Sequence, residues 1–121
     1  MRVDEMPAGG KLNCLIAERL FNWEDAGWDP LYCRFVGHPT KERYRWYEQV
    51  PDYSTDIARA WEVVEKMKNY LFVCGRTDDG IWEAYFFPVN SGIGKLSEAH
   101  GDTAPSAICR AALKAMGVTE C

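Results

Sequence analysis

The segment VPDYSTDIARAWEVVEKMKNY, residues 50–70, restricts the fold of this chain more than any other stretch. Apolar residues recur in it at helical spacing, at positions 57, 60, 61, 64 and 67, which predicts an amphipathic helix. Ser54 or Thr55 can accept a hydrogen bond from a first-turn amide, and Asp56 lies near the positive end of the helix dipole. We therefore interpret the polar cluster at residues 52–56 as the start of a helix rather than as a functional site.

Two further helices are predicted from the same kind of pattern. One covers about residues 11–22, where apolar residues recur at helical spacing at Leu12, Leu15, Ile16 and Leu20. The other covers about residues 104–116, where small residues keep one side narrow enough for close approach to a sheet. Asp102 or Thr103 can cap this last helix, and Gly117 can end it.

Strands are predicted in two places. Residues 70–74 are continuously apolar and residues 81–87 are largely apolar, and the turn-forming segment 76–80 between them favours an antiparallel hairpin. Because both sides of these strands carry apolar residues, we expect helices to cover the sheet on both faces. Residues 31–36 and 43–49 look extended as well and predict an irregular hairpin.

Composition limits the class of protein. At 121 residues the chain is expected to form a single domain over residues 1–121, with residues 1–10 as a flexible N-terminus. A net charge of -4 and a pI near 5.2 disfavour binding to extended nucleic acid, which requires a clustered positive field. The N-terminal residues lack the apolar core of a signal peptide, and no apolar run reaches the roughly 18 residues of a membrane span. We expect a cytoplasmic protein that does not bind membranes.

Three of these segments, LNCLIAERLFNW, PDYSTDIARAWEVVEKM and DTAPSAICRAALKAMG, resemble the phage alpha-beta-alpha sandwich domain family of small bacteriophage and prophage proteins. The resemblance covers most of the chain except residues 24–48. It implies an α+β fold in which a small, mainly antiparallel sheet is packed by three helices as an alpha-beta-alpha sandwich. It also implies a phage or prophage origin and the host bacterial cytoplasm, but no catalytic residue and no cofactor.

The candidate binding residues lie in an aromatic segment between Trp23 and Tyr53, which holds half of the chain's Phe, Trp and Tyr residues. In KERYRWY, residues 41–47, arginines alternate with aromatic residues. On a strand this pattern would place two guanidinium groups on one side and two rings on the other, a combination that binds bases and phosphates. The same alternation is typical of a half-buried strand with exposed arginines. The residues that we select as the ligand or partner site are Arg43, Tyr44, Arg45, Trp46 and Trp28.

Other candidate sites have weaker patterns. Residues 90–103 are predicted to form a long loop whose Gly94-Lys95 lacks the spacing of a phosphate-binding loop. Cys33, His38 and His100 have no paired short spacing, and we predict no metal site. The five cysteines are interpreted as reduced, mostly buried thiols. Two indole rings that could line a pocket are interpreted as core residues by default: Trp61 and Trp82.

These observations predict a non-enzymatic phage or prophage accessory protein that binds a host or phage protein, or a small ligand, through the aromatic segment. Interference with a host process such as bacterial defence would fit the resemblance. One alternative is a nucleotide-binding or nucleotide-sequestering protein that uses Arg43, Arg45 and the 90–103 loop. Another is a virion or assembly component whose aromatic surface forms a homo-oligomer interface.

Overall fold

The structure is a computed structural model that describes residues 1–39, 47–89 and 96–120. The described residues form three α-helices, α1 (Gly10–Leu20), α2 (Ile57–Lys66) and α3 (Ala104–Ala115), after a short 3-10 helix, η1 (Val3–Glu5). They also form two antiparallel three-stranded sheets. The first sheet contains β1 (Glu24–Asp29), β2 (Arg34–His38) and β3 (Glu48–Gln49), and the second contains β4 (Tyr70–Arg76), β5 (Trp82–Pro88) and β6 (Ser97–Gly101).

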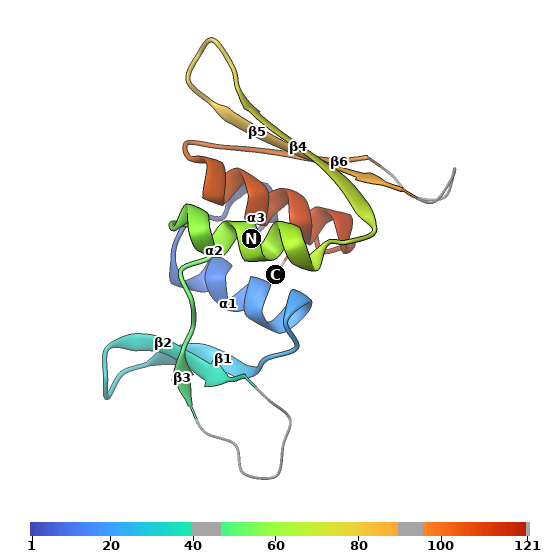
Figure 1. Cartoon of the computed structure of the whole chain (residues 1–121). Coiled ribbons are helices and arrows are strands. Elements are labelled where there is room, and N and C mark those ends of the chain that lie inside the picture. The colour runs from blue at the N-terminus through green and yellow to red at the C-terminus, as the bar shows by residue number, and fades with distance from the viewer. Residues whose placement is uncertain (40–46, 90–95, 121) are drawn as a thin grey trace.

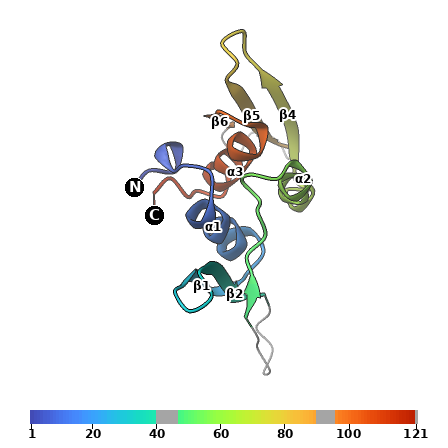
Figure 2. The same ribbon diagram turned by 90° about the vertical axis from the view of Figure 1, so that its left-hand side faces the viewer.

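The helices lie between the two sheets (Figure 1). Helix α3 packs on β5 and β6 and also contacts α2, whereas α1 packs on β1 and β2. Turning the molecule by 90° shows the same order, with sheet β4–β6 beside α3 and sheet β1–β3 beside α1 (Figure 2). The predicted α+β class, with mainly antiparallel strands packed by helices, is confirmed. Within the described ranges, no helix is long and apolar enough to cross a membrane.

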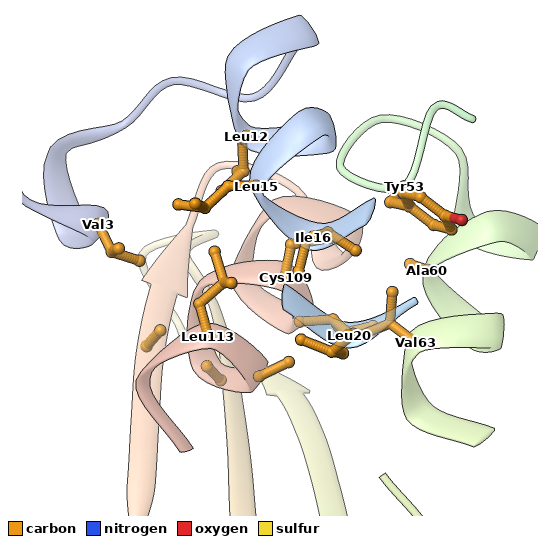
Figure 3. Packing of buried hydrophobic residues seen from close by; sticks show 14 of the residues in the cluster. Val3, Leu12, Leu15, Ile16, Leu20, Tyr53, Ala60, Val63, Cys109 and Leu113 are labelled. Carbon is orange, nitrogen blue, oxygen red and sulfur yellow. The ribbon is translucent and has the colours of Figure 1, made fainter. Parts of the chain in front are cut away.

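The hydrophobic core lies where the helices meet. Figure 3 shows Ile16 and Leu20 of α1, Val63 of α2, and Cys109 and Leu113 of α3 pointing toward one another, and all five side chains are buried. The predicted first and third helices agree with α1 and α3 to within two residues at each end. As expected, Thr103 caps α3 by accepting a hydrogen bond from the Ser106 amide, at 3.4 Å. Gly117 ends the helix with a φ of 83°, a left-handed conformation that favours glycine.

The hairpin β4–β5 also has the predicted pairing, but the sheet contains a strand that the sequence did not indicate. Residues 97–101, which we expected to lie in a loop, form β6 and pair with β5 in unbroken antiparallel register. Side chains alternate regularly across this sheet. Ala84, Phe86 and Ala99 are buried on the side that faces α3, while the residues between them point to the opposite side. That opposite face is exposed, so the expectation that helices cover both faces was wrong.

Sheet β1–β3 is less regular. Its register shifts between Glu24 and Gly27, and Asp25 has a φ of 54°. The predicted pairing of residues 31–36 with 43–49 is present in part, because Val36 lies opposite Gln49 and Gly37 opposite Glu48. The longer partner of β2 is instead β1, which precedes it in the chain and which we did not predict.

The N-terminal residues 1–10, which we expected to be a flexible segment, contribute side chains to the core. Val3 and Met6 are both buried. The Val3 amide donates a hydrogen bond to the Thr119 carbonyl at 2.8 Å, and Arg2 forms an isolated bridge with Glu120. The guanidinium of Arg110, on α3, donates to the Met6 carbonyl with its Nε at 3.1 Å. These contacts attach the first residues to α3 and to the end of the chain.

Candidate binding surfaces

The polar cluster at residues 52–56 has a structural role, as predicted. The Asp56 carboxylate accepts a hydrogen bond from the Ala58 amide at 2.9 Å and is the N-cap of α2, so the expectation that Ser54 or Thr55 accepts this bond was wrong. Ser54 is fully buried, and both its amide and its hydroxyl donate to the Asn13 side-chain oxygen, at 2.8 and 2.6 Å. These bonds cap α2 and hold the chain against α1, while Asp52 and Asp56 also line a hollow of about 320 Å³.

Four of the five selected site residues, Arg43, Tyr44, Arg45 and Trp46, lie outside the described residues. The fifth, Trp28, is near the end of β1 and is 55% exposed. Its ring packs edge-on against Phe35, with 5.1 Å between the ring centroids. Trp23, by contrast, is partly buried and packs against the core. The exposed position of Trp28 is what the prediction of a recognition residue requires, although the four other residues remain a prediction.

Around Trp28, sheet β1–β3 and its turns carry several large side chains that are more than half exposed. We define the aromatic surface by four residues: Trp28, Leu31 at 80%, Tyr32 at 65% and Tyr47 at 59% exposed. Trp28 and Tyr47 line one hollow of about 330 Å³, whose rim includes Asp25 and Asp29. Tyr47 lies over the His38 ring at a centroid distance of 4.0 Å, which holds it at one wall of that hollow. Large rings that stay this exposed are typical of protein contact surfaces.

A second surface involves the two tryptophans that we interpreted as core. Trp61 is 51% exposed and its neighbour Ile57 is 56% exposed, so the interpretation of Trp61 as a core residue was wrong. Trp82 is partly buried against the core. The apolar groove is a hollow of about 480 Å³ between α2, the sheet and the start of α3, and we define it by Ile57, Trp61, Phe72, Trp82, Pro105 and Ile108.

The reason for the error at Trp61 is the rotation of α2. Its core-facing residues are Ala60, Val63 and Met67, while Trp61 lies beside them and meets Phe72 edge-on at 6.0 Å. The Arg76 guanidinium lies 5.9 Å from the centre of the Trp82 ring, close to the other end of the groove. An apolar hollow of this size matches the usual dimensions of a small-molecule site. The sequence feature that indicated the apolar groove was the wide apolar stripe on α2.

A larger cleft, of about 740 Å³, lies between α2 and sheet β1–β3. Its walls include Phe21, Trp23 and Tyr53, and its charged residues are three bases and three acids: Arg59, Lys66, Lys68, Glu48, Glu62 and Glu65. Because the charges are balanced, the cleft does not create the positive field that a phosphate group requires. The strands that flank the two segments of the nucleotide alternative also lie in different sheets, on opposite sides of the helices (Figure 1).

Three of the described thiols, those of Cys14, Cys74 and Cys109, are not activated. Burial raises the pKa of the Cys14 thiol to about 11, and it also raises the pKa values of Cys74 and Cys109. Thiols of this kind stay protonated near neutral pH and are poor nucleophiles. His38 belongs to β2 and His100 to β6, so the structure separates two of the three residues considered as metal ligands. In the part of the chain that the structure describes, no three His, Cys, Asp or Glu side chains form a group that could hold a metal ion.

Helices between two antiparallel sheets, with apolar side chains exposed on both sheets, define a small α+β sandwich domain. The model of the family described as the phage ABA sandwich domain matches residues 14–113, from within α1 to within α3. The chain belongs to this family and is a phage protein domain, as the resemblance implied.

The structure is similar to a crystal structure at 2.0 Å of a phage protein from Bacillus cereus ATCC 14579. The TM-score is 0.67 and the sequence identity is 28%, over 96% of this chain and 93% of the other. The likeness therefore extends beyond residues 14–113. No curated protein matches the chain.

Proposed function

We propose that this chain is a non-enzymatic phage accessory protein that binds a host protein through the aromatic surface. The observation that carries the proposal is the exposure of Trp28, Leu31, Tyr32 and Tyr47 around one small sheet. Exposed rings gain most when a partner covers them, because they bury a large area with few rotatable bonds. The hollow between Trp28 and Tyr47 supplies a place for a side chain of the partner.

A binding role also agrees with the chemistry of the described residues. The buried polar side chains of Asn13 and Ser54 satisfy each other, and the buried thiols have raised pKa values. Neither arrangement activates a nucleophile or a base for catalysis. Interference with a host process, such as a bacterial defence system, is the setting we propose for this binding, and only the phage family supports it.

The test is capture of a partner from a bacterial host lysate, followed by measurement of the dissociation constant with the identified and purified partner. We expect the triple variant Trp28→Ala, Tyr32→Ala and Tyr47→Ala to weaken binding by about 100-fold or more, because central aromatic residues supply most of the energy of such interfaces. The matched control is Trp61→Ala, which removes an indole of similar exposed fraction from another surface. Equal affinity of the triple variant and the intact chain would contradict the proposal.

A small apolar ligand is the second candidate, and a different observation favours it. The apolar groove has walls made almost entirely of carbon, with Trp61 and Phe72 packed edge-on at one side. Such a lining selects neutral, mainly apolar molecules by burial rather than by hydrogen bonding.

A thermal-shift screen of neutral aromatic fragments, with nucleotides in the same plate, separates a site for a small apolar ligand from the nucleotide-binding alternative. A fragment at about 100 times its dissociation constant adds about 2.7 kcal/mol to the free energy of unfolding. The shift should disappear in Trp61→Ala and persist in Trp28→Ala. A shift with nucleotides alone would instead support the nucleotide-binding alternative.

A further inference from the structure

The face of sheet β4–β6 that points away from α3 is apolar at one end and polar at the other. We define the outer face by its apolar residues Leu71, Val73, Phe87, Val89 and Leu96, which are 62%, 52%, 38%, 53% and 50% exposed. Pairing places Leu71 beside Phe87 and Val73 beside Tyr85. Val89 continues this register through the hydrogen bond from its amide to the Asn69 carbonyl, at 2.9 Å.

The polar end of the same face satisfies its own groups. The Tyr85 hydroxyl donates to one oxygen of the Glu83 carboxylate at 2.9 Å, and His100 Nε2 lies 3.3 Å from the other oxygen. Glu98 is paired with Tyr85 across the strands and is exposed. This end can therefore remain at the solvated rim of an interface while the apolar end is covered.

The size of the face is sufficient for a protein interface. The five apolar side chains expose on the order of 400–500 Å² as one patch, which is within the range of the largest apolar patch on a typical monomer, and such patches often have a function. Adding the polar end brings the face to roughly 800 Å², the area that each partner contributes to a stable interface of standard size. The apolar residues on both sides of β4 and β5 are typical of strands covered on both faces, whereas the helices cover only one.

We propose that the outer face is a homodimer interface in which two copies of the chain pack their β4–β6 sheets face to face. Sheets pack in this way with aligned strands at a separation of about 10 Å, and the apolar end of this face can cover the apolar end of a second copy. A second copy can pack here without bringing carboxylates of the two copies together. Whether they stay apart depends on the direction of the symmetry axis.

The axis that fits lies in the interface plane, crosses the strands and passes near Leu71 and Phe87. Apolar rows then meet apolar rows, and Val73 of one copy faces the row that contains Val89 of the other. Glu98 shares the row of Val73 and Glu83 lies one row further out, so the carboxylates of the two copies lie on opposite sides of the axis and like charges are kept apart. An axis parallel to the strands would instead place Val73 against Glu98, which buries a carboxylate on an apolar side chain.

The first test is the mass of the intact chain in solution, measured by sedimentation equilibrium from about 1 to 100 µM, a range that spans the dissociation constants of weak dimers. We expect a reversible increase from 13.8 kDa to twice that mass. Val73→Lys should raise the dissociation constant by 100-fold or more, because two buried ammonium groups would enter the interface. Leu31→Lys, at an even more exposed apolar position on the other sheet, is the matched control and should leave it unchanged.

The second test does not depend on destabilising the dimer. In a background with Cys33→Ser and Cys121→Ser, Phe87→Cys lies next to the axis and should form a disulfide with its own copy on mild oxidation, whereas Glu83→Cys should not. Far-UV circular dichroism of each variant checks that the fold is kept. A chain that stays at 13.8 kDa up to 100 µM, or equal cross-linking at positions 83 and 87, would overturn the proposal.

Discussion

The two sheets lie on opposite sides of the same helices, but they are attached to them in different ways. In sheet β4–β6 the register is unbroken and Phe86 is fully buried beneath α3. In sheet β1–β3 the register shifts after Glu24, and the last strand contains only Glu48 and Gln49. The less regular sheet, whose strands hold only the aromatic residues Trp28 and Phe35, therefore contributes less to the core.

Close approach of the backbones contributes to the burial of sheet β4–β6 against α3. The residues of β6 that face α3 are small, and a Cβ atom added at Gly101 would overlap the side chain of Ser106. Sheet β1–β3 meets α1 at one comparable place, where a Cβ atom at Gly10 would overlap the ring of Phe35. We infer that sheet β4–β6 carries stability and that sheet β1–β3 is available for recognition.

The largest expected effect tests that inference directly. Phe86→Ala should lower the free energy of unfolding by about 3–5 kcal/mol, because a fully buried ring leaves a cavity. Phe35→Ala, on the other sheet, should lower it by about 1–3 kcal/mol because its ring is only partly buried. Urea unfolding followed by circular dichroism measures both values. Equal losses would show that the two sheets contribute alike and would remove the distinction drawn here.

The next largest effect concerns Tyr53, in the segment that connects β3 to α2. Burial, with a smaller effect of Glu62, raises the pKa of Tyr53 from 10.0 to about 12. Because the folded state holds this proton more tightly, its contribution is fully present below pH 10 and is lost as the pH rises from 10 to 12. The loss should reach about 2–3 kcal/mol in the free energy of unfolding. Tyr53→Phe keeps the stacking on Phe21, at 5.0 Å, and should remove this part of the alkaline decline.

The Cys14 thiol, whose pKa is about 11, adds its own decline from pH 9 upward. For that reason the informative quantity is the difference between the intact chain and Tyr53→Phe, measured by thermal unfolding at several pH values. If the two curves stay parallel from pH 9 to 12, Tyr53 is accessible to water in the folded state and the segment before α2 is looser than its burial indicates.

The sequence predicted the elements whose cause is local. The helical conformation of α2 and the caps at Thr103 and Gly117 depend on residues within one or two helical turns, and these predictions were confirmed. Strand β6, SEAHG, contains no β-branched or aromatic residue, so its strand conformation arises from pairing with β5 and from packing under α3. Neither cause can be recognised in a window of five residues.

For the candidate surfaces, the sequence indicated which residues could bind but not how they are oriented. Periodicity placed Trp61 on the apolar side of α2, yet the rotation of that helix against α3 decides that Ala60 and Val63 are buried and Trp61 is half exposed. Trp28 is exposed as a recognition residue should be. The contribution of residues 43–46 stays a prediction because they lie outside the described ranges.

A smaller effect tests how sheet β1–β3 is fastened to the helices. The chain that leaves β3 reaches α2 through Ser54, whose amide and hydroxyl both donate to Asn13 on α1. Asn13→Ala should lower the free energy of unfolding by about 2 kcal/mol, because two buried donors lose their acceptor. A double-mutant cycle with Ser54→Ala measures the coupling, and additive losses would show that water replaces the missing oxygen.

The smallest effect separates a helix cap from a functional carboxylate. Asp56→Ala should lower the free energy of unfolding by about 1 kcal/mol, because the Ala58 amide loses its partner. Asp56→Asn keeps the acceptor and loses only the charge near the helix dipole, so it should cost no more than about 0.5 kcal/mol, and less at high salt. Urea unfolding at two salt concentrations measures both.

Ligand binding in the apolar groove distinguishes the two roles of Asp56, because Asp56 is next to Ile57 of the groove in sequence. A cap predicts that Asp56→Asn retains both stability and any fragment shift, whereas a binding carboxylate predicts that the shift disappears while stability is retained.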